Sequence, residues 1–71
     1  MNDYVLTDKQ REVVLALADC GMNVTKASKK IFRHRNAVLH HIKRIREATA
    51  KDPMNFYDLV ELVEGVKGHG T

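Results

Sequence analysis

The sequence lacks several features that define whole classes of proteins. Cys20 is the only cysteine among 71 residues, which excludes an intrachain disulfide. We expect Cys20 to be a small, partly buried residue at a helix end rather than a redox or metal-binding thiol. No apolar run approaches the roughly 18 residues that a membrane span requires. The first residues, MNDYVLTD, carry an acid where a signal peptide has basic residues, so we expect a cytoplasmic protein.

Patterns typical of enzymes and metal sites are also missing. The basic middle of the chain has no paired carboxylates, no Ser-His-Asp order and no glycine-rich phosphate loop. His40 and His41 are adjacent and would point about 100° apart on a helix, whereas paired metal ligands on a helix are three or four residues apart. A single small domain leaves no room for a substrate pocket. We therefore expect neither an enzyme nor a bound metal or cofactor.

The charges that are present are strongly segregated along the chain. The segment from Lys26 to Lys51 carries +8, the residues before it −2 and the residues after it −3, which together give the formal net charge of +3. Such segregation concentrates a positive field on one surface, as a protein that binds a polyanion requires. The alternative is a basic face that serves solubility alone.

The apolar pattern predicts an all-α protein, a small four-helix domain that contains a helix-turn-helix. The helices are expected over about residues 7–20, 23–31, 35–48 and 55–66. One domain then covers residues 1–66, and residues 67–71 form a flexible tail at the end of the segment GVKGHGT.

Capping signals mark the ends of these helices. Thr7 and Gln10 fit a capping box, with Val5 or Leu6 as the hydrophobic staple. Gly21 is expected to end the first helix in a left-handed conformation. The other predicted N-caps are Asn23, His34 and Asn55, the last of them with reciprocal capping from Asp58.

Apolar residues at helical spacing give each predicted helix an inward side. These residues are Val13, Val14, Leu17 and, as a further candidate, Ala18 in the first helix, then Val24, Ala27 and Ile31, then Val38, Ile42 and Ile45. Phe32 is expected to fill the space between the second and third helices, the alternative being that it stacks on a base. The last helix has a wider apolar surface that closes the core or forms a dimer interface: Phe56, Leu59, Val60, Leu62, Val63 and Val66.

The outward side of the third helix carries side chains suited to DNA bases. In a helix-turn-helix the second helix of the pair lies in the major groove, where Arg pairs with guanine, Asn with adenine, and apolar groups contact thymine methyls. The predicted base-reading residues are Arg35, Asn36, Leu39, His40 and Lys43. The predicted phosphate-binding residues are Thr25, Lys26, Lys29, Lys30, Arg33, His34, Arg44 and Arg46. We expect His41 at the edge of the core or near a phosphate.

The stretch from Leu15 to Val63, most of the chain, resembles a known family. The run NVTKASKKIFRHRNAVLHHIKRIRE, in which the triplet His34-Arg35-Asn36 is the most specific part, is similar to the C-terminal helix-turn-helix domain of PucR/CdaR-type bacterial transcription regulators. The segment TAKDPMNFYDLVEL is similar to the end of that domain, and the architecture also resembles Fis-like regulators. The departures are Ala37, where the family usually has Thr, and Leu39, His40 and His41. The resemblance implies a helix-turn-helix that binds DNA.

Together these patterns predict sequence-specific binding of double-stranded DNA by a small bacterial or phage-borne transcription regulator. We expect a homodimer, formed through the last helix (Phe56, Leu59, Val60 and Val63) or the first. The alternative is a helix-turn-helix used as a protein-protein interaction module, whose basic face meets an acidic partner. The initial Met and the short acidic lead-in favour a standalone chain.

Overall fold

Four helices and no strand make up residues 6–68, the part of the chain that the computed structural model describes. In chain order they are α1 (Asp8–Asp19), α2 (Val24–Lys30), α3 (Arg35–Thr49) and α4 (Phe56–Gly68). The all-α prediction is confirmed, and every helix end lies within two residues of its predicted place. The largest difference is that α4 includes residues 67 and 68 of the predicted tail, while residues 69–71 lie outside the described part.

The caps predicted for α1 are present at both of its ends. The Thr7 hydroxyl accepts a hydrogen bond from the Gln10 N–H at 3.1 Å, and the Gln10 side-chain carbonyl accepts one from the Thr7 N–H at 2.9 Å. Leu6 is the buried apolar residue before this box, whereas the other candidate, Val5, lies outside the described residues. Gly21 follows the helix with a φ of 62°, a left-handed conformation that costs glycine no strain.

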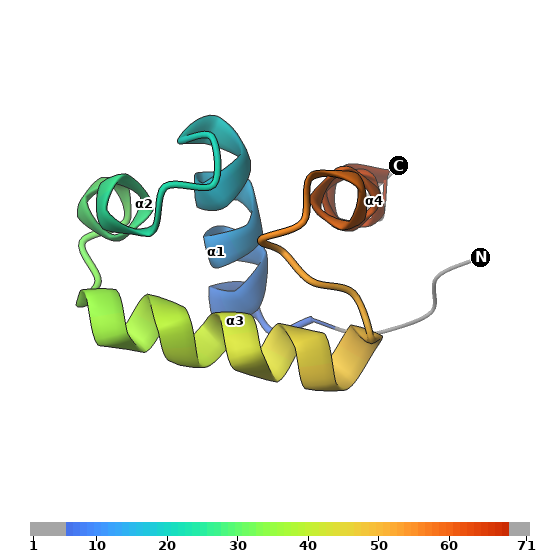
Figure 1. The fold of residues 1–71 in the computed structure, drawn as a ribbon, viewed down its shortest axis with the longest axis horizontal. Helices are drawn as coiled ribbons and strands as arrows, with labels where there is room; N and C mark the ends of the chain where they lie inside the picture. Colours follow the sequence, from blue (N-terminus) through green and yellow to red (C-terminus); the bar gives the residue numbers. More distant parts are fainter. Residues whose placement is uncertain (1–5, 69–71) are drawn as a thin grey trace.

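Helix α1 is the element on which the other helices pack. α2, α3 and α4 each pack against α1, and α2 also packs against α3, whereas the backbone of α4 stays away from both α2 and α3. In Figure 1, α3 runs along the bottom of the molecule, and the other three helices all lie above it, on one side of α3. The outward side of α3 is therefore left uncovered by the rest of the described fold.

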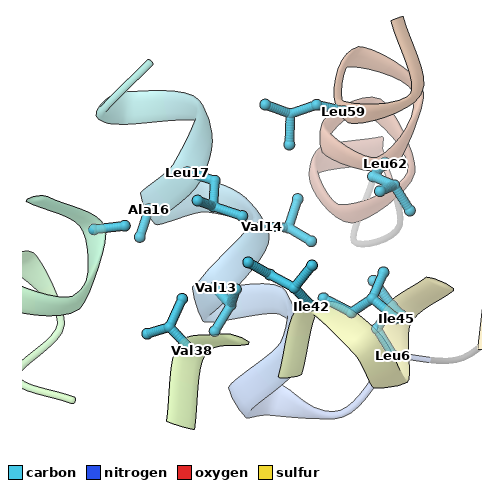
Figure 2. Close-up of a cluster of buried hydrophobic side chains, with 11 residues drawn as sticks. Leu6, Val13, Val14, Ala16, Leu17, Val38, Ile42, Ile45, Leu59 and Leu62 are labelled. Carbon is cyan, nitrogen blue, oxygen red and sulfur yellow. The ribbon is translucent and has the colours of Figure 1, made fainter. Parts of the chain in front are cut away.

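The core is built from the apolar stripes that the sequence predicts, with one exchange in α1 (Figure 2). Val13, Val14 and Leu17 are buried as expected, but the fourth buried residue of α1 is Ala16, and Ala18 is exposed. Figure 2 shows Ala16 on the side of α1 that faces α2. The exchange arises because α1 is covered from several directions, so its buried surface is wider than one stripe.

Phe32 is not in the core, and the prediction that it fills the space between α2 and α3 is wrong. Its side chain is 94% exposed, and its φ of 55° lies in the left-handed region. The chain reverses directly after α2, where the Arg33 N–H donates to the Ser28 carbonyl at 2.9 Å. The left-handed residue in this reversal directs its ring into solvent, and the partly buried Ile31 packs against the core instead.

The connection between α3 and α4 is closed by hydrogen bonds from side chains. Asn55 caps α4 as predicted, since its side-chain carbonyl accepts from the N–H groups of Tyr57 and Asp58 at 3.0 and 3.2 Å. The predicted reciprocal cap by Asp58 is wrong, because this carboxylate accepts from the Asp52 N–H at 3.0 Å. With the buried Pro53, these bonds hold the start of α4 beside α1 and away from the outward side of α3.

Candidate nucleic-acid interface

The outward side of α3 brings together the five residues predicted to read bases. Val38, Ile42 and Ile45 are buried and fix the rotation of α3 about its own axis. Five exposed residues form what we call the recognition face: Asn36, Leu39, His40 and Lys43, which point away from this stripe, and Arg35, the first residue of α3. Figure 1 shows no other helix on the outward side of α3. Their role in reading bases stays a prediction.

His34 prepares the N-terminal end of α3 for an anion. It occupies the N-cap position, and its ring Nδ1 accepts a hydrogen bond from the Asn36 N–H at 3.2 Å. Because Nδ1 is the acceptor, the proton of the neutral ring is on Nε2, which leaves an exposed N–H donor on the outer edge of the ring. This donor lies beside the first turn of α3, where the partial positive charge of the helix terminus also favours an anion.

The exposed cations of α2, α3 and the turn between them fall into two groups. Three lie near acids of the free protein: Lys30 near Asp19 at 3.9 Å, Arg33 near Glu12 at 3.5 Å, and Arg46 near Asp52 at 3.9 Å. Five others form no ion pair within residues 6–68: Lys26, Lys29, Arg35, Lys43 and Arg44. Exposed ion pairs are weak, so a phosphate can displace the acid from a cation of the first group. The cations of the second group can bind a phosphate without first leaving an acid.

Two small residues allow α2 to approach α3 closely. Ala27 is fully buried, as expected, and Ser28 is also buried, which the sequence pattern did not predict. The Ser28 hydroxyl donates to the Thr25 carbonyl at 2.8 Å, so the buried oxygen is satisfied within its own helix. The spacing of four residues from the half-buried Val24 to Ser28 is the signal that would have found this position.

Glu47 limits the recognition face at its C-terminal end. This exposed acid follows Lys43 by four residues and therefore lies on the same side of α3. A carboxylate at this place repels phosphates, so the recognition face suited to DNA bases ends at Lys43. Helix-turn-helix proteins contact bases with the N-terminal part of their recognition helix, which is the part that remains here.

His41 lies at the edge of the core, one of the two positions expected for it. Its side chain is half buried, and its ring meets the exposed His40 ring edge-on with centroids 5.9 Å apart. Burial lowers the pKa of His41 below its ordinary 6.5, and the positive charges of His40, Lys9 and Arg33 act in the same direction. Both histidines border a shallow depression that reaches the N-terminus of α1.

A second surface lies between α1 and α4 and involves no residue of α3. This α1–α4 groove is apolar and is lined mainly by Ala18, Met22, Phe56, Val60, Val63 and Glu64. Phe56 is 59% exposed and Val60 40% exposed, although both belong to the apolar surface of α4. The opening of this groove explains why Ala18 is not buried. Cys20, partly buried at the end of α1, packs against the core nearby, as expected for a helix-end residue.

Two further observations concern sites that the described residues do not form. None of the four helices combines the length and the apolar character needed to cross a membrane. Within residues 6–68, no three His, Cys, Asp or Glu side chains are grouped as the ligands of a metal ion would be.

Comparison with known proteins places the chain in a family. Neither the curated proteins nor the solved structures gave a match. The family model of the PucR C-terminal helix-turn-helix domain, in contrast, matches residues 10–65. The matched region contains α2, α3 and most of α1 and α4, and therefore the whole recognition face. The family is of a regulatory, DNA-binding type rather than an enzymatic one. The chain belongs to the family of PucR C-terminal helix-turn-helix domains.

Proposed function

We propose that this protein binds double-stranded DNA sequence-specifically, with α3 in the major groove. The observation that carries the proposal is the recognition face, which is exposed, bears cations without an acidic partner among the described residues, and is left uncovered by α4. An α-helix fits the major groove, where the edges of all four base pairs can be distinguished. The membership of the chain in a helix-turn-helix family supports the same mode of binding.

Each side chain of the recognition face has a role in this proposal. Arg35 donates two hydrogen bonds to guanine, and Asn36 pairs with adenine through its amide. Leu39, which is 41% exposed, packs on a thymine methyl group. His40 and Lys43 read base edges further along the groove.

Phosphate contacts position α3 in the groove and supply most of the salt-dependent affinity. The proposed phosphate-binding residues are Thr25, Lys26, Lys29, Lys30, Arg33, His34, Arg44 and Arg46. Among the cations, we expect Lys26, Lys29 and Arg44 to contribute most, because they hold no ion pair within the described chain. Lys30, Arg33 and Arg46 must first leave an acid.

The test is selection of binding sites from random duplexes, followed by fluorescence anisotropy across a salt series. Selection should enrich a defined half-site. If the three unpaired phosphate-binding cations, Lys26, Lys29 and Arg44, each neutralise one phosphate, log affinity should fall against log salt with a slope of at least about −2.7 for one protomer. An affinity that does not change with salt, or a selection that enriches no sequence, contradicts the proposal.

We further infer that two copies bind together through their α1–α4 grooves. A helix-turn-helix dimer places its recognition helices about 34 Å apart, one turn of DNA. The molecule measures 31 Å along its longest axis, so two copies placed end to end along this axis have their centres at about this spacing. The exposed Phe56 and Val60 provide the apolar contact. Because Glu64 lies in the groove, the contact brings like charges together, and we expect salt to strengthen the free dimer.

Sedimentation velocity tests the dimer with a matched pair of substitutions on one helix. Val60→Glu places a charge in the groove and should give a monomer. Tyr57→Glu places the same charge on an exposed residue outside the groove lining, and should leave the dimer intact. A wild-type protein that stays monomeric with and without its selected duplex rules out this arrangement.

We also propose that the protein acts as a small transcription regulator in the cytoplasm, because the family to which the chain belongs is of a regulatory, DNA-binding type. A reporter gene placed behind the selected sequence measures this role. Expression should change when the protein is produced, and should not change with Asn36→Ala. An unchanged reporter with the wild-type protein would argue against regulation.

A further inference from the structure

The turn between α2 and α3 carries an aromatic residue that the fold does not use. Phe32 is 94% exposed, the highest value among the large hydrophobic side chains of the described chain. An aromatic side chain that is fully buried removes roughly 150–250 Å² from water, and Phe32 gains none of this in the free protein. Its exposure therefore favours a contact with something outside the chain.

The backbone conformation of Phe32 is a second unfavourable feature of the free protein. Phe32 has a φ of 55°, a left-handed conformation that glycine or asparagine adopts more readily than an aromatic residue. The turn itself is held by the backbone, since the Phe32 N–H donates to the Lys29 carbonyl at 3.3 Å and the Arg33 N–H to the Ser28 carbonyl at 2.9 Å. None of these bonds needs a ring at position 32. A glycine would form the same turn with less strain.

The position of Phe32 points to the ligand of the recognition face. It precedes Arg35 by three residues, so the two Cα atoms are separated by at most about 11 Å. Its neighbours Lys29, Lys30 and Arg33 are exposed cations, which suit a polyanion and not an apolar protein surface. In the major groove of intact DNA the apolar group within reach of a side chain is the thymine methyl, because the bases remain stacked.

We propose that Phe32 is a DNA-contacting residue whose ring packs against a thymine methyl at the edge of the bound half-site. The inference rests on the proposed function, because it requires α3 to lie in the major groove. It adds an apolar contact on the turn to the polar contacts of Arg35 and Asn36. It also explains the aromatic residue at a left-handed position, where the free protein gains nothing from it.

A thymine scan combined with Phe32→Gly tests the contact. Each thymine of the selected duplex is replaced in turn by deoxyuridine, which removes only the methyl group. Wild-type protein should lose about fourfold in affinity at the thymine that Phe32 contacts. Phe32→Gly should bind the unmodified duplex about tenfold more weakly and should be insensitive to the same replacement. Equal affinity of the two proteins, or equal penalties at every thymine, overturns the proposal.

Two controls separate this contact from folding and from charge. Phe32→Gly and Phe32→Asn should melt at or above the temperature of the wild type, since both residues tolerate the left-handed turn. Their salt slopes should equal the wild-type slope, because no phosphate contact is lost. Leu39→Ala should still lose affinity when the thymine that Phe32 contacts is replaced by deoxyuridine. It should be insensitive to replacement of a different thymine, the one that Leu39 contacts.

Tryptophan offers an independent measurement, because the chain contains none. Phe32→Trp should show a blue shift of its emission on addition of the selected duplex, since the ring leaves water. Tyr57→Trp, an exposed position on α4, should show no shift. An unshifted emission of Phe32→Trp under saturating DNA overturns the inference while leaving DNA binding intact, whereas the absence of any DNA binding by the wild type refutes the proposed function itself.

Discussion

The recognition face of α3 and the α1–α4 groove are both exposed, but they differ in every property that selects a partner. The recognition face carries Arg35, Asn36 and Lys43 with acids absent until Glu47. The groove is apolar, and its charged lining residue is the acid Glu64. A polyanion is attracted to the first and repelled from the second. This small fold therefore places a cationic surface and an apolar surface on different helices.

The reason for this separation lies in how α4 is attached. Its inner residues Leu59 and Leu62 are buried against the core, while Phe56 and Val60 remain exposed. Since the backbone of α4 lies close to α1 and away from α3, its acidic residues stay away from the recognition face. Changes at four places test this difference: the attachment of α4, the recognition face, the proposed phosphate contacts, and the boundary between α3 and the core.

The largest effect is expected from Leu62→Ala, which removes the fully buried anchor of α4. A buried leucine replaced by alanine costs about 2–5 kcal/mol of unfolding free energy. For a domain of this size each kcal/mol lowers Tm by about 4–8 °C, so a fall of at least ~8 °C is expected in thermal denaturation followed by circular dichroism. Val60→Ala, on the exposed side of the same helix, is the control and should lower Tm by less. Equal effects would mean that α4 is not anchored through its inner side.

Asn36→Ala should give the next effect and should act on the recognition face alone. Its side chain makes no hydrogen bond within the described residues, so stability and oligomeric state should not change. A lost bidentate pair with adenine should reduce discrimination at one base pair by about 1–3 kcal/mol. Competition anisotropy against duplexes changed at single positions measures this loss. A uniform loss for all duplexes would show that Asn36 does not read a base.

Lys29→Ala and Lys30→Ala form a matched pair that tests the role of the internal acids. Lys29 makes no ion pair in the described chain, whereas Lys30 lies 3.9 Å from Asp19. Loss of a full phosphate contact flattens the slope of log affinity against log salt by about 0.9. We expect this change for Lys29→Ala and a smaller one for Lys30→Ala. The reverse order would contradict the division of the cations into two groups.

The smallest effect is expected from pH, through His41. Because burial lowers its pKa in the folded protein, the unfolded chain takes up the proton first as pH falls below 6.5. Stability is therefore present above this pH and is lost as pH falls towards the lowered pKa. His41→Gln should weaken this dependence in denaturant melts at several pH values, and His40→Gln should retain more of it. A wild-type protein whose stability rises as pH falls over this range would contradict the assignment.

Most of the fold follows from local patterns in the sequence. The stripe Val38, Ile42 and Ile45 is predicted by helical periodicity and is buried in the structure. The caps at Thr7 and Asn23 need only residues three positions apart, and both are formed. The exposed positions of Asn36 and Lys43 follow from the same periodicity, because the buried stripe determines which residues lie opposite to it.

What could not be predicted depends on distances between residues far apart in the sequence. Phe32 is apolar, and only the left-handed reversal after α2 turns it into solvent. Arg33 approaches Glu12 because α1 passes beside the turn, and no spacing along the chain encodes that approach. Asp58 could reach either its own helix terminus or the Asp52 N–H, and the path of the α3–α4 connection decided for the latter.

The four helices, their inner sides and the concentration of positive charge between Lys26 and Lys51 follow from local sequence, because helix formation and amphipathic periodicity depend on neighbours within a few residues. Only the tertiary structure decided which cations stand near an acid, that α4 leaves α3 uncovered, and that an apolar groove opens between α1 and α4. Those features arise when helices distant in the chain pack against one another, and packing is a property of the assembled core rather than of any one segment.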